Sequence, residues 1–262
     1  MQPSARATHH PRVRDFDDST LWRISGFNRV RLETGSSGFA RLSAATVLPT
    51  TLLADLRRLD ADPAANDLLE VLAACMRHRE AALLCIECDG LVWPITVFPV
   101  QQVVHSPRAL LAGPVGGLAQ ATLLTAEPPG VRPPGHWMHE RIAHADHYRP
   151  LLPLLWMLAL QGPRTTLLAE IAGTAAYRAT RHLTDHGLAA PGALSSAAQR
   201  LRRETVALKV VAGWPGMSAE RASRLLNGLY LVSALLVTRA HPAARAEPKS
   251  LRERLGGNKP PR

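Results

Sequence analysis

The densest group of potentially reactive side chains lies in CMRHREAALLCIEC, residues 75–88, which holds all three cysteines of the chain. Cys75-x-x-His78 followed by Cys85-x-x-Cys88 has the outline of a zinc site, because structural zinc takes four nitrogen or sulfur ligands in tetrahedral geometry. The spacing argues against that chemistry. The last two cysteines belong to a run of strand character, and residues three apart on a strand point to opposite faces. We therefore interpret the cysteines as small core residues, the first on the apolar stripe of a helix.

A second candidate metal site lies in HWMHERIAHADHY, which begins at residue 136. On a helix turning about 100° per residue, three imidazoles and one carboxylate fall within about 80° of one another, and such a set binds zinc or another transition metal. These residues are His136, Glu140, His144 and His147. The H-E-x-x-H order of zinc peptidases is absent, because one residue too many separates the pair. We favour an ordinary solvated helix and expect no bound metal and no cofactor.

No other arrangement of residues indicates catalysis. The segment GSSG at 35–38 is not the G-x-S-x-G of a nucleophile elbow. GPVGG at 113–117 lacks the lysine and the Ser/Thr of a phosphate-binding loop, and no G-x-G-x-x-G motif is present. We therefore expect a protein that is not an enzyme.

Positive charge is concentrated in the second half of the chain. Residues 1–148 contain 14 arginines and 15 acidic residues, a net charge of −1, whereas residues 149–262 contain 17 basic and 6 acidic residues, a net charge of +11. Such an asymmetry indicates an anionic partner, most often nucleic acid or an acidic protein surface. The alternative is a set of solvated arginines that keeps the protein in solution.

The composition is that of a globular protein, with 46% hydrophobic and 20% charged residues. Three closely spaced cysteines do not make a disulfide framework, and the N-terminal residues lack the apolar segment of a signal peptide. The longest apolar runs fall well short of the ~20 residues that a membrane span needs. We expect a cytoplasmic protein with no membrane partner. Only three of its 31 basic residues are lysine, a bias typical of GC-rich bacterial genomes.

The first half of the chain predicts both helices and strands. LWRISGFNRVRLET supplies one or two short strands, and helices are predicted over PTTLLADLRRL and over about 63–79. In ALLCIECDGLVWPITVFPV, two apolar runs flank Asp89-Gly90, the preferred pair for a type I′ turn, so we predict a hairpin that pairs Cys88 with Leu91. A proline inside the second run places that strand at an edge or turns the missing N–H away from the neighbouring strand.

The second half predicts mostly helices. RPLLPLLWMLAL, QGPRTTLLAEIAG and TAAYRATRHLTDHGLA predict three short helices, and another follows Ser195 or Ser196. In element lengths and apolar spacing, residues 150–190 resemble winged-helix and helix-turn-helix DNA-binding domains. No pair of wing strands is evident where APGALSS follows.

A last helix is predicted over residues 218–239, with Ser218 as its N-cap. It is apolar almost all round from Leu225 to Val237, which is typical of a helix buried in a core or in a subunit interface. A protein partner, or a second copy of the chain in a homodimer, is therefore expected to bind through this helix if its apolar face is exposed.

The sequence thus predicts the fold class α+β, with an N-terminal α+β domain that contains a β-hairpin and a C-terminal, mostly α-helical, winged-helix-like domain. The proline- and glycine-rich EPPGVRPPG is the predicted boundary. The expected organisation is a disordered tail (1–18), a sensing or interaction domain (19–126), a linker (127–135), a basic helical domain (136–241) and a disordered basic tail (242–262).

The basic residues of the second half are the candidate binding site. On a helix starting at Thr174, three of them share an exposed face at i, i+3 and i+4, as donors to phosphates and guanine edges would. Others follow in the next two predicted helices. The predicted nucleic-acid contacts are Arg178, Arg181, His182, Arg200, Arg203 and Arg221.

These observations favour a non-catalytic bacterial regulatory protein that binds nucleic acid through its basic C-terminal domain. The alternative is a protein–protein adaptor or scaffold that binds no nucleic acid, which the missing wing strands favour. A third hypothesis, a metal-dependent enzyme, depends on the histidine cluster binding a metal.

Overall fold

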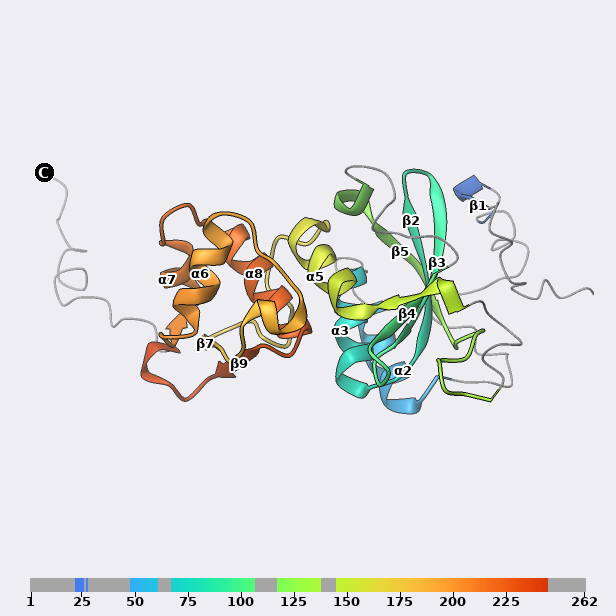
Figure 1. Cartoon of the computed structure of the whole chain (residues 1–262), viewed down its shortest axis with the longest axis horizontal. Coiled ribbons are helices and arrows are strands. Elements are labelled where there is room, and N and C mark those ends of the chain that lie inside the picture. The colour runs from blue at the N-terminus through green and yellow to red at the C-terminus, as the bar shows by residue number, and fades with distance from the viewer. Residues whose placement is uncertain are drawn as a thin grey trace, which may run out of the picture. The chain divides into compact units, whose positions relative to one another are not determined.

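The computed structural model describes residues 22–25, 27, 48–60, 67–106, 117–137 and 145–244, and divides the chain into two compact units (Figure 1). The first unit ends at Arg164 and the second begins at Thr165. The predicted tails lie outside the described residues, apart from the short 3₁₀ helix η6 (Pro242–Ala244). The molecule is a mixed α/β protein with an antiparallel sheet in each unit. Within the described residues, no helix is long and apolar enough to span a bilayer.

The first unit is built on an antiparallel sheet in the order β5-β2-β3-β4-β6, with β1 paired to β3. The two inner strands β2 and β3 are buried on both faces, and Figure 1 shows α3 and α5 packed beside the sheet. The elements of this unit are β1 (Trp22–Arg23), α2 (Thr50–Asp60), α3 (Leu68–His78), β2 (Ala82–Cys88), β3 (Leu91–Phe98), β4 (Val103–His105), η3 (Gly117–Gln120), β5 (Thr122–Glu127), η4 (Ala145–His147), β6 (Tyr148–Pro150) and α5 (Leu151–Gln161).

The predicted hairpin is confirmed. Cys88 pairs with Leu91, and the two turn residues Asp89 and Gly90 have φ values of 53° and 72°, as a type I′ turn requires. The strand that contains Pro94 is an inner strand, paired with β2 on one side. On its other side β1 pairs with residues 91–92 and β4 with residues 96–98, so the proline lies in the gap between these two pairings. Its missing N–H therefore removes no ladder hydrogen bond on that side.

Two ion-pair groups fix the helices of the first unit. Arg164 contacts Asp67 and Glu70 at 2.7 Å each, and all three side chains are largely buried. Asp67 is also the N-cap of α3, where its carboxylate accepts a hydrogen bond from the N–H of Leu69. At the end of α3, Nε2 of His78 lies 2.7 Å from Oδ2 of Asp55 on α2. The hydrogen bonds from His78 and Arg77 lower the pKa of the Asp55 carboxyl group.

The position of the boundary differs from the one expected at the proline-rich stretch. Strand β6 pairs with β4, and α5 follows directly, so residues 148–161 complete the sheet unit rather than starting a helical one. Leu151, Leu154 and Leu155 of α5 are buried. The first of the three predicted short helices is confirmed, but it belongs to the first unit.

The second unit combines three helices with a three-stranded antiparallel sheet in the order β8-β7-β9. The central strand is the first of the three in the chain, and its Tyr177 is fully buried. The elements are β7 (Ala176–Ala179), η5 (Leu183–His186), α6 (Ala193–Leu201), β8 (Val206–Ala207), α7 (Leu208–Ala212), α8 (Ala219–Leu231), β9 (Leu235–Thr238) and η6.

Of the helix predictions for this unit, two are wrong and a third is wrong in part. Residues 162–175 form turns, and the helix predicted from Thr174 is the strand β7 followed by a loop and a 3₁₀ turn. The helix predicted through 239 does begin at the N-cap Ser218, but it ends at Leu231, and the rest of its apolar run forms β9. Leu225, Leu226 and Leu229 are buried inside this same unit, which removes the reason for a dimer seam along α8.

Candidate anion-binding face

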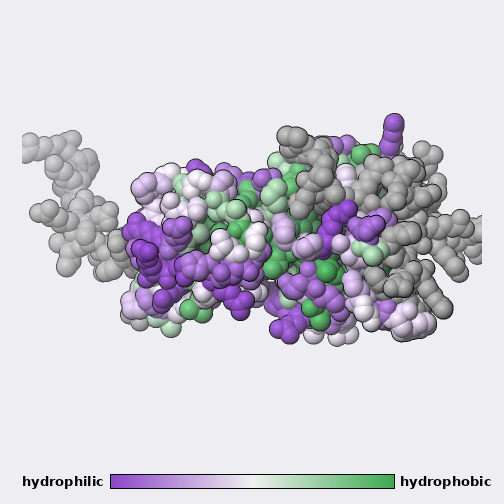
Figure 2. Space-filling view, viewed as in Figure 1, coloured by the Kyte–Doolittle hydropathy of each residue, from purple (hydrophilic) through white to green (hydrophobic). Residues whose placement is uncertain are grey.

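Helix α6 positions three basic side chains of the second unit in and directly after its last turn. Its N-cap is a glycine that follows a proline, and Leu194, Ala197, Ala198 and Leu201 form its buried stripe. No acidic residue occurs in the helix, and Arg200, Arg202 and Arg203 lie in or directly after its last turn, as does Gln199. In Figure 2, hydrophilic side chains gather over the part of this unit where α6 and α7 lie.

The loop after β7 brings further basic residues to the end of α6. The Nε of Arg178 donates to the main-chain oxygen of Arg202 at 3.3 Å, and the guanidinium of Arg202 lies 2.7 Å from Nδ1 of His182. Arg181 lies between the strand and this histidine. Residues separated by 20 or more positions in the sequence therefore share one exposed area.

A second group of basic side chains surrounds the turn between α7 and α8. The Arg200 guanidinium lies 4.6 Å above the ring of Trp214, a cation–π contact, and Arg221 donates to the Gly216 carbonyl at 2.6 Å. Gly216 has a φ of 73°, and a Cβ there would lie 2.8 Å from that of Ala193, so this turn packs tightly against the first residue of α6. Arg221 therefore lies near the start of α6.

We define the α6 face as the six residues Arg178, Arg181, His182, Arg200, Arg202 and Arg203, with Arg221 at its border. Most of its charge is not neutralised by carboxylates. Glu204 binds Arg200 at 3.0 Å, and Asp185 accepts a hydrogen bond from a main-chain N–H. Among the described residues, no ion-pair partner is found for the other arginines of this face. The structure thus gathers the predicted basic residues on and around one helix, although Arg178 is on a strand and not on the predicted helix.

Helix α8 is not available as a helix that enters a DNA groove. A helix that reads bases must present one long side to the major groove. Asn227, on the side of α8 opposite its leucine stripe, is fully buried, and its side chain binds the main chain of Thr166 at 2.8 Å and of Leu168 at 2.9 Å. Only the first turn of α8, including Arg221, remains exposed.

The candidate metal ligands do not form a cluster in the described part of the chain. His136 lies in a turn and His147 in the 3₁₀ helix η4, whereas Glu140 and His144 lie outside the described residues. Within these limits, no group of three or more potential ligands is found. The ring of His147 instead lies 5.6 Å from that of His105, in an edge-on arrangement.

The three cysteines are buried, as predicted from their spacing, and none of them forms a disulfide. Cys75 lies on α3, and the other two lie on β2, three residues apart. Burial raises the pKa of the Cys75 thiol to about 12, and that of the Cys88 thiol is also raised, because a thiolate is poorly solvated in these positions. A neutral buried thiol is neither a nucleophile nor a zinc ligand.

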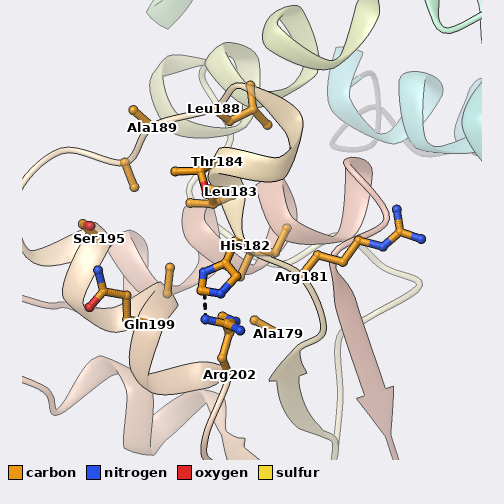
Figure 3. A pocket seen from close by; sticks show the side chains of 13 residues that line it. Ala179, Arg181, His182, Leu183, Thr184, Leu188, Ala189, Ser195, Gln199 and Arg202 are labelled. Atoms are coloured by element: carbon orange, nitrogen blue, oxygen red, sulfur yellow. Dashed lines mark hydrogen bonds between the residues drawn. The ribbon is translucent and has the colours of Figure 1, made fainter.

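A pocket of about 180 Å³ opens beside the α6 face (Figure 3). Its polar wall is formed by Ser195, Gln199 and Arg202, which lie on successive turns along one side of α6 and its C-terminal end. His182 and Thr184, from the segment after β7, complete this wall. The remaining wall is apolar and comes from alanines of β7 and α6, from the loop around Leu188, and from Leu229 of α8. The side chain of Arg181 runs away from the other polar groups (Figure 3).

The sequence prediction named Arg181 and His182 but not Ser195, Gln199 or Thr184, which also line the pocket. Ser195, Gln199 and Arg202 follow one another at i, i+4 and i+7, the spacing of one side of a helix, and this signal could have been read. The part supplied by the loop after β7 could not, because a helix was expected there.

Comparison with protein-family models, with curated proteins and with solved structures finds no match for this chain.

Proposed function

We propose that this protein is a non-catalytic regulatory protein whose second unit binds the phosphate backbone of nucleic acid through the α6 face. The observation that supports it is the gathering of arginines around one helix where, among the described residues, Arg200 alone has a carboxylate partner. Guanidinium groups bind phosphate oxygens through paired N–H donors, and the arginines here keep most of their five donors free.

The proposed binding is independent of base sequence. The pair α7–α8 has the order of a helix-turn-helix, and three helices with a three-stranded sheet have the composition of a winged-helix domain. However, the long side of α8 is covered through Asn227, so base edges in the major groove would be out of its reach. Backbone contacts supply affinity and carry no direct sequence information.

Salt dependence gives this proposal a quantitative test. Five arginines of the α6 face and its border have no carboxylate partner among the described residues: Arg178, Arg181, Arg202, Arg203 and Arg221. If each neutralises one phosphate, the slope of log K against log salt is about −4.5 on duplex DNA. Affinity would then fall about 500-fold between 50 and 200 mM salt.

The experiment titrates a fluorescent duplex of random sequence with the full chain at four salt concentrations. The double variant Arg181→Gln/Arg203→Gln removes two exposed charges of the face and should make the slope shallower by about 2. The control Arg57→Gln/Arg132→Gln removes two exposed charges from the first unit and should leave the slope unchanged. If both variants make the slope shallower by the same amount, the binding depends on net charge alone.

Absence of binding to any duplex at 50 mM salt would reject nucleic acid as the partner. The alternative, a protein adaptor, would then be the better hypothesis, with exposed apolar side chains of the first unit such as Val100 and Trp137 as the contacts to test first.

A further inference from the structure

The pocket beside α6 has the two parts that a small-molecule site needs. Such sites combine mostly apolar walls with a few polar groups that converge on one point. Here the imidazole of His182, the guanidinium of Arg202 and the amide of Gln199 lie at one end (Figure 3), and leucine and alanine side chains line the rest. The volume of about 180 Å³ is close to the roughly 150 Å³ of an apolar cavity that binds benzene, which limits the ligand to a small compound.

The charge of the polar end indicates which ligand fits. A guanidinium is always protonated and can only donate, so Nδ1 of His182, 2.7 Å from Arg202, is the acceptor of that hydrogen bond. Nε2 is then the ring nitrogen that can donate to a ligand. With Arg181 directed away, Arg202 supplies one positive charge to the pocket. One charge matches a monoanion better than a doubly charged phosphate.

We propose that this pocket binds a small organic carboxylate, with the carboxylate at Arg202 and His182 and a short apolar body against Leu188 and Leu229. The planar guanidinium offers paired donors at the spacing of two carboxylate oxygens. The hydroxyl of Ser195 and the amide of Gln199 provide further donors along the same wall. The inference does not depend on nucleic-acid binding, because it concerns a small molecule held in the pocket. Arg202 and His182 belong to both the pocket and the α6 face, so a bound carboxylate would occupy one of the proposed phosphate contacts.

The test uses the full chain and benzoate as the probe, with benzamide as its neutral isostere and inorganic phosphate as a second anion. Binding is measured by calorimetry and by saturation-transfer NMR. A compound of this size is expected to bind with a Kd on the order of 1 mM. Benzamide and phosphate are each expected to bind at least tenfold more weakly, because one lacks the charge and the other the apolar body.

Two variants examine the pocket from different sides. Arg202→Met removes its charge and is expected to weaken benzoate binding at least tenfold, since hydrogen bonds to a charged group are the strong ones. Ser195→Leu fills the pocket without changing charge and should weaken binding as much, and it keeps the test valid if the first variant fails to fold. The matched control is Arg200→Met, on the same helix but bound to Trp214 and Glu204, which should alter Kd less than twofold.

The proposal is rejected if benzoate does not bind, or if benzamide or phosphate binds as tightly as benzoate. It is also rejected if Arg200→Met weakens binding as much as Arg202→Met, because a general positive field would then be responsible. If the chain binds benzoate but no DNA, the pocket proposal is supported and only the proposed nucleic-acid function is rejected.

Discussion

The replacement of Asn227 by alanine is expected to detach the start of the second unit from α8. In the native protein, its Oδ1 accepts from the N–H of Leu168 at 2.9 Å and its Nδ2 donates to the carbonyl of Thr166 at 2.8 Å. Both Asn227 and Leu168 are fully buried. One side chain thus satisfies two main-chain groups of a segment that has no helix or strand of its own.

The expected cost follows from what the substitution leaves behind. A buried N–H without a partner costs about 1–3 kcal/mol, and the Leu168 N–H would be such a group. The Thr166 carbonyl belongs to an exposed residue, so water can replace part of its lost bond. We expect a loss of about 2–3 kcal/mol, which corresponds to exchange that is about 30- to 150-fold faster for amides protected by this unit.

Hydrogen–deuterium exchange followed by mass spectrometry measures this locally, which matters because a chain of two units does not unfold in one transition. The peptides to follow cover residues 166–172 and 219–231. The control is Ser223→Ala on the same helix, whose hydroxyl donates only to the Ala219 carbonyl of its own helix, and whose loss should cost less than about 1 kcal/mol. If Asn227→Ala speeds exchange no more than the serine control does, the idea that this amide anchors the segment is wrong.

Three further predictions concern the first unit. Arg164→Met should lower its unfolding free energy by about 3 kcal/mol, measured by chemical denaturation, because two largely buried carboxylates at the start of α3 lose the cation that contacts both of them. An unchanged midpoint would contradict this. Native protein at pH 8 should react with a thiol reagent at none of its cysteines, and at all three after unfolding; a fast-reacting thiol would contradict the burial of Cys75. Asp55 has a lowered pKa in the folded protein. Its carboxylate therefore contributes on the order of 1 kcal/mol of stability above pH 3.8, and this contribution is lost as the pH falls through the folded-state pKa. The wild type should be more stable than Asp55→Asn at pH 7, and equally stable in strong acid.

The sequence prediction succeeded where one short stretch of residues determines the local structure. Asp89-Gly90 fixes a two-residue turn and therefore the register of both strands, and Ser218 marks the start of α8. The placement of the cysteines followed from the period of a strand. In each case, the neighbours in sequence are also the neighbours that determine the conformation.

The sequence prediction failed where contacts between residues far apart in the chain determine the secondary structure. The stretch around Tyr177 is rich in alanine and has helical propensity, yet it pairs with Val206 and Val237, and burial between these two strands outweighs a weak local preference. The run after α8 was read as helix because it is apolar throughout. Ser233, with a φ of 56°, ends that helix and sends the run into β9.

The candidate site was predictable in charge but not in arrangement. The excess of arginine in the second half is visible in the sequence, and the six predicted contact residues do lie on or around α6. The contact between His182 and Arg202 depends on β7 being a strand that delivers its following loop to the end of that helix. A prediction that places the histidine on a helix cannot bring these two side chains together.

The order of the strands in the small sheet has a consequence for biosynthesis. The central strand β7 is synthesised first, but both of its partners come later, and the last, β9, pairs Thr238 with Ala176 across 62 intervening steps of chain. During synthesis, Tyr177 of β7 therefore stays exposed until β9 has left the ribosome and the sheet can form. Unpaired apolar strands of this kind bind chaperones or aggregate. A fragment that stops before Leu235 should consequently be recovered as aggregate, whereas one that spans residues 165–244 contains every strand the sheet requires.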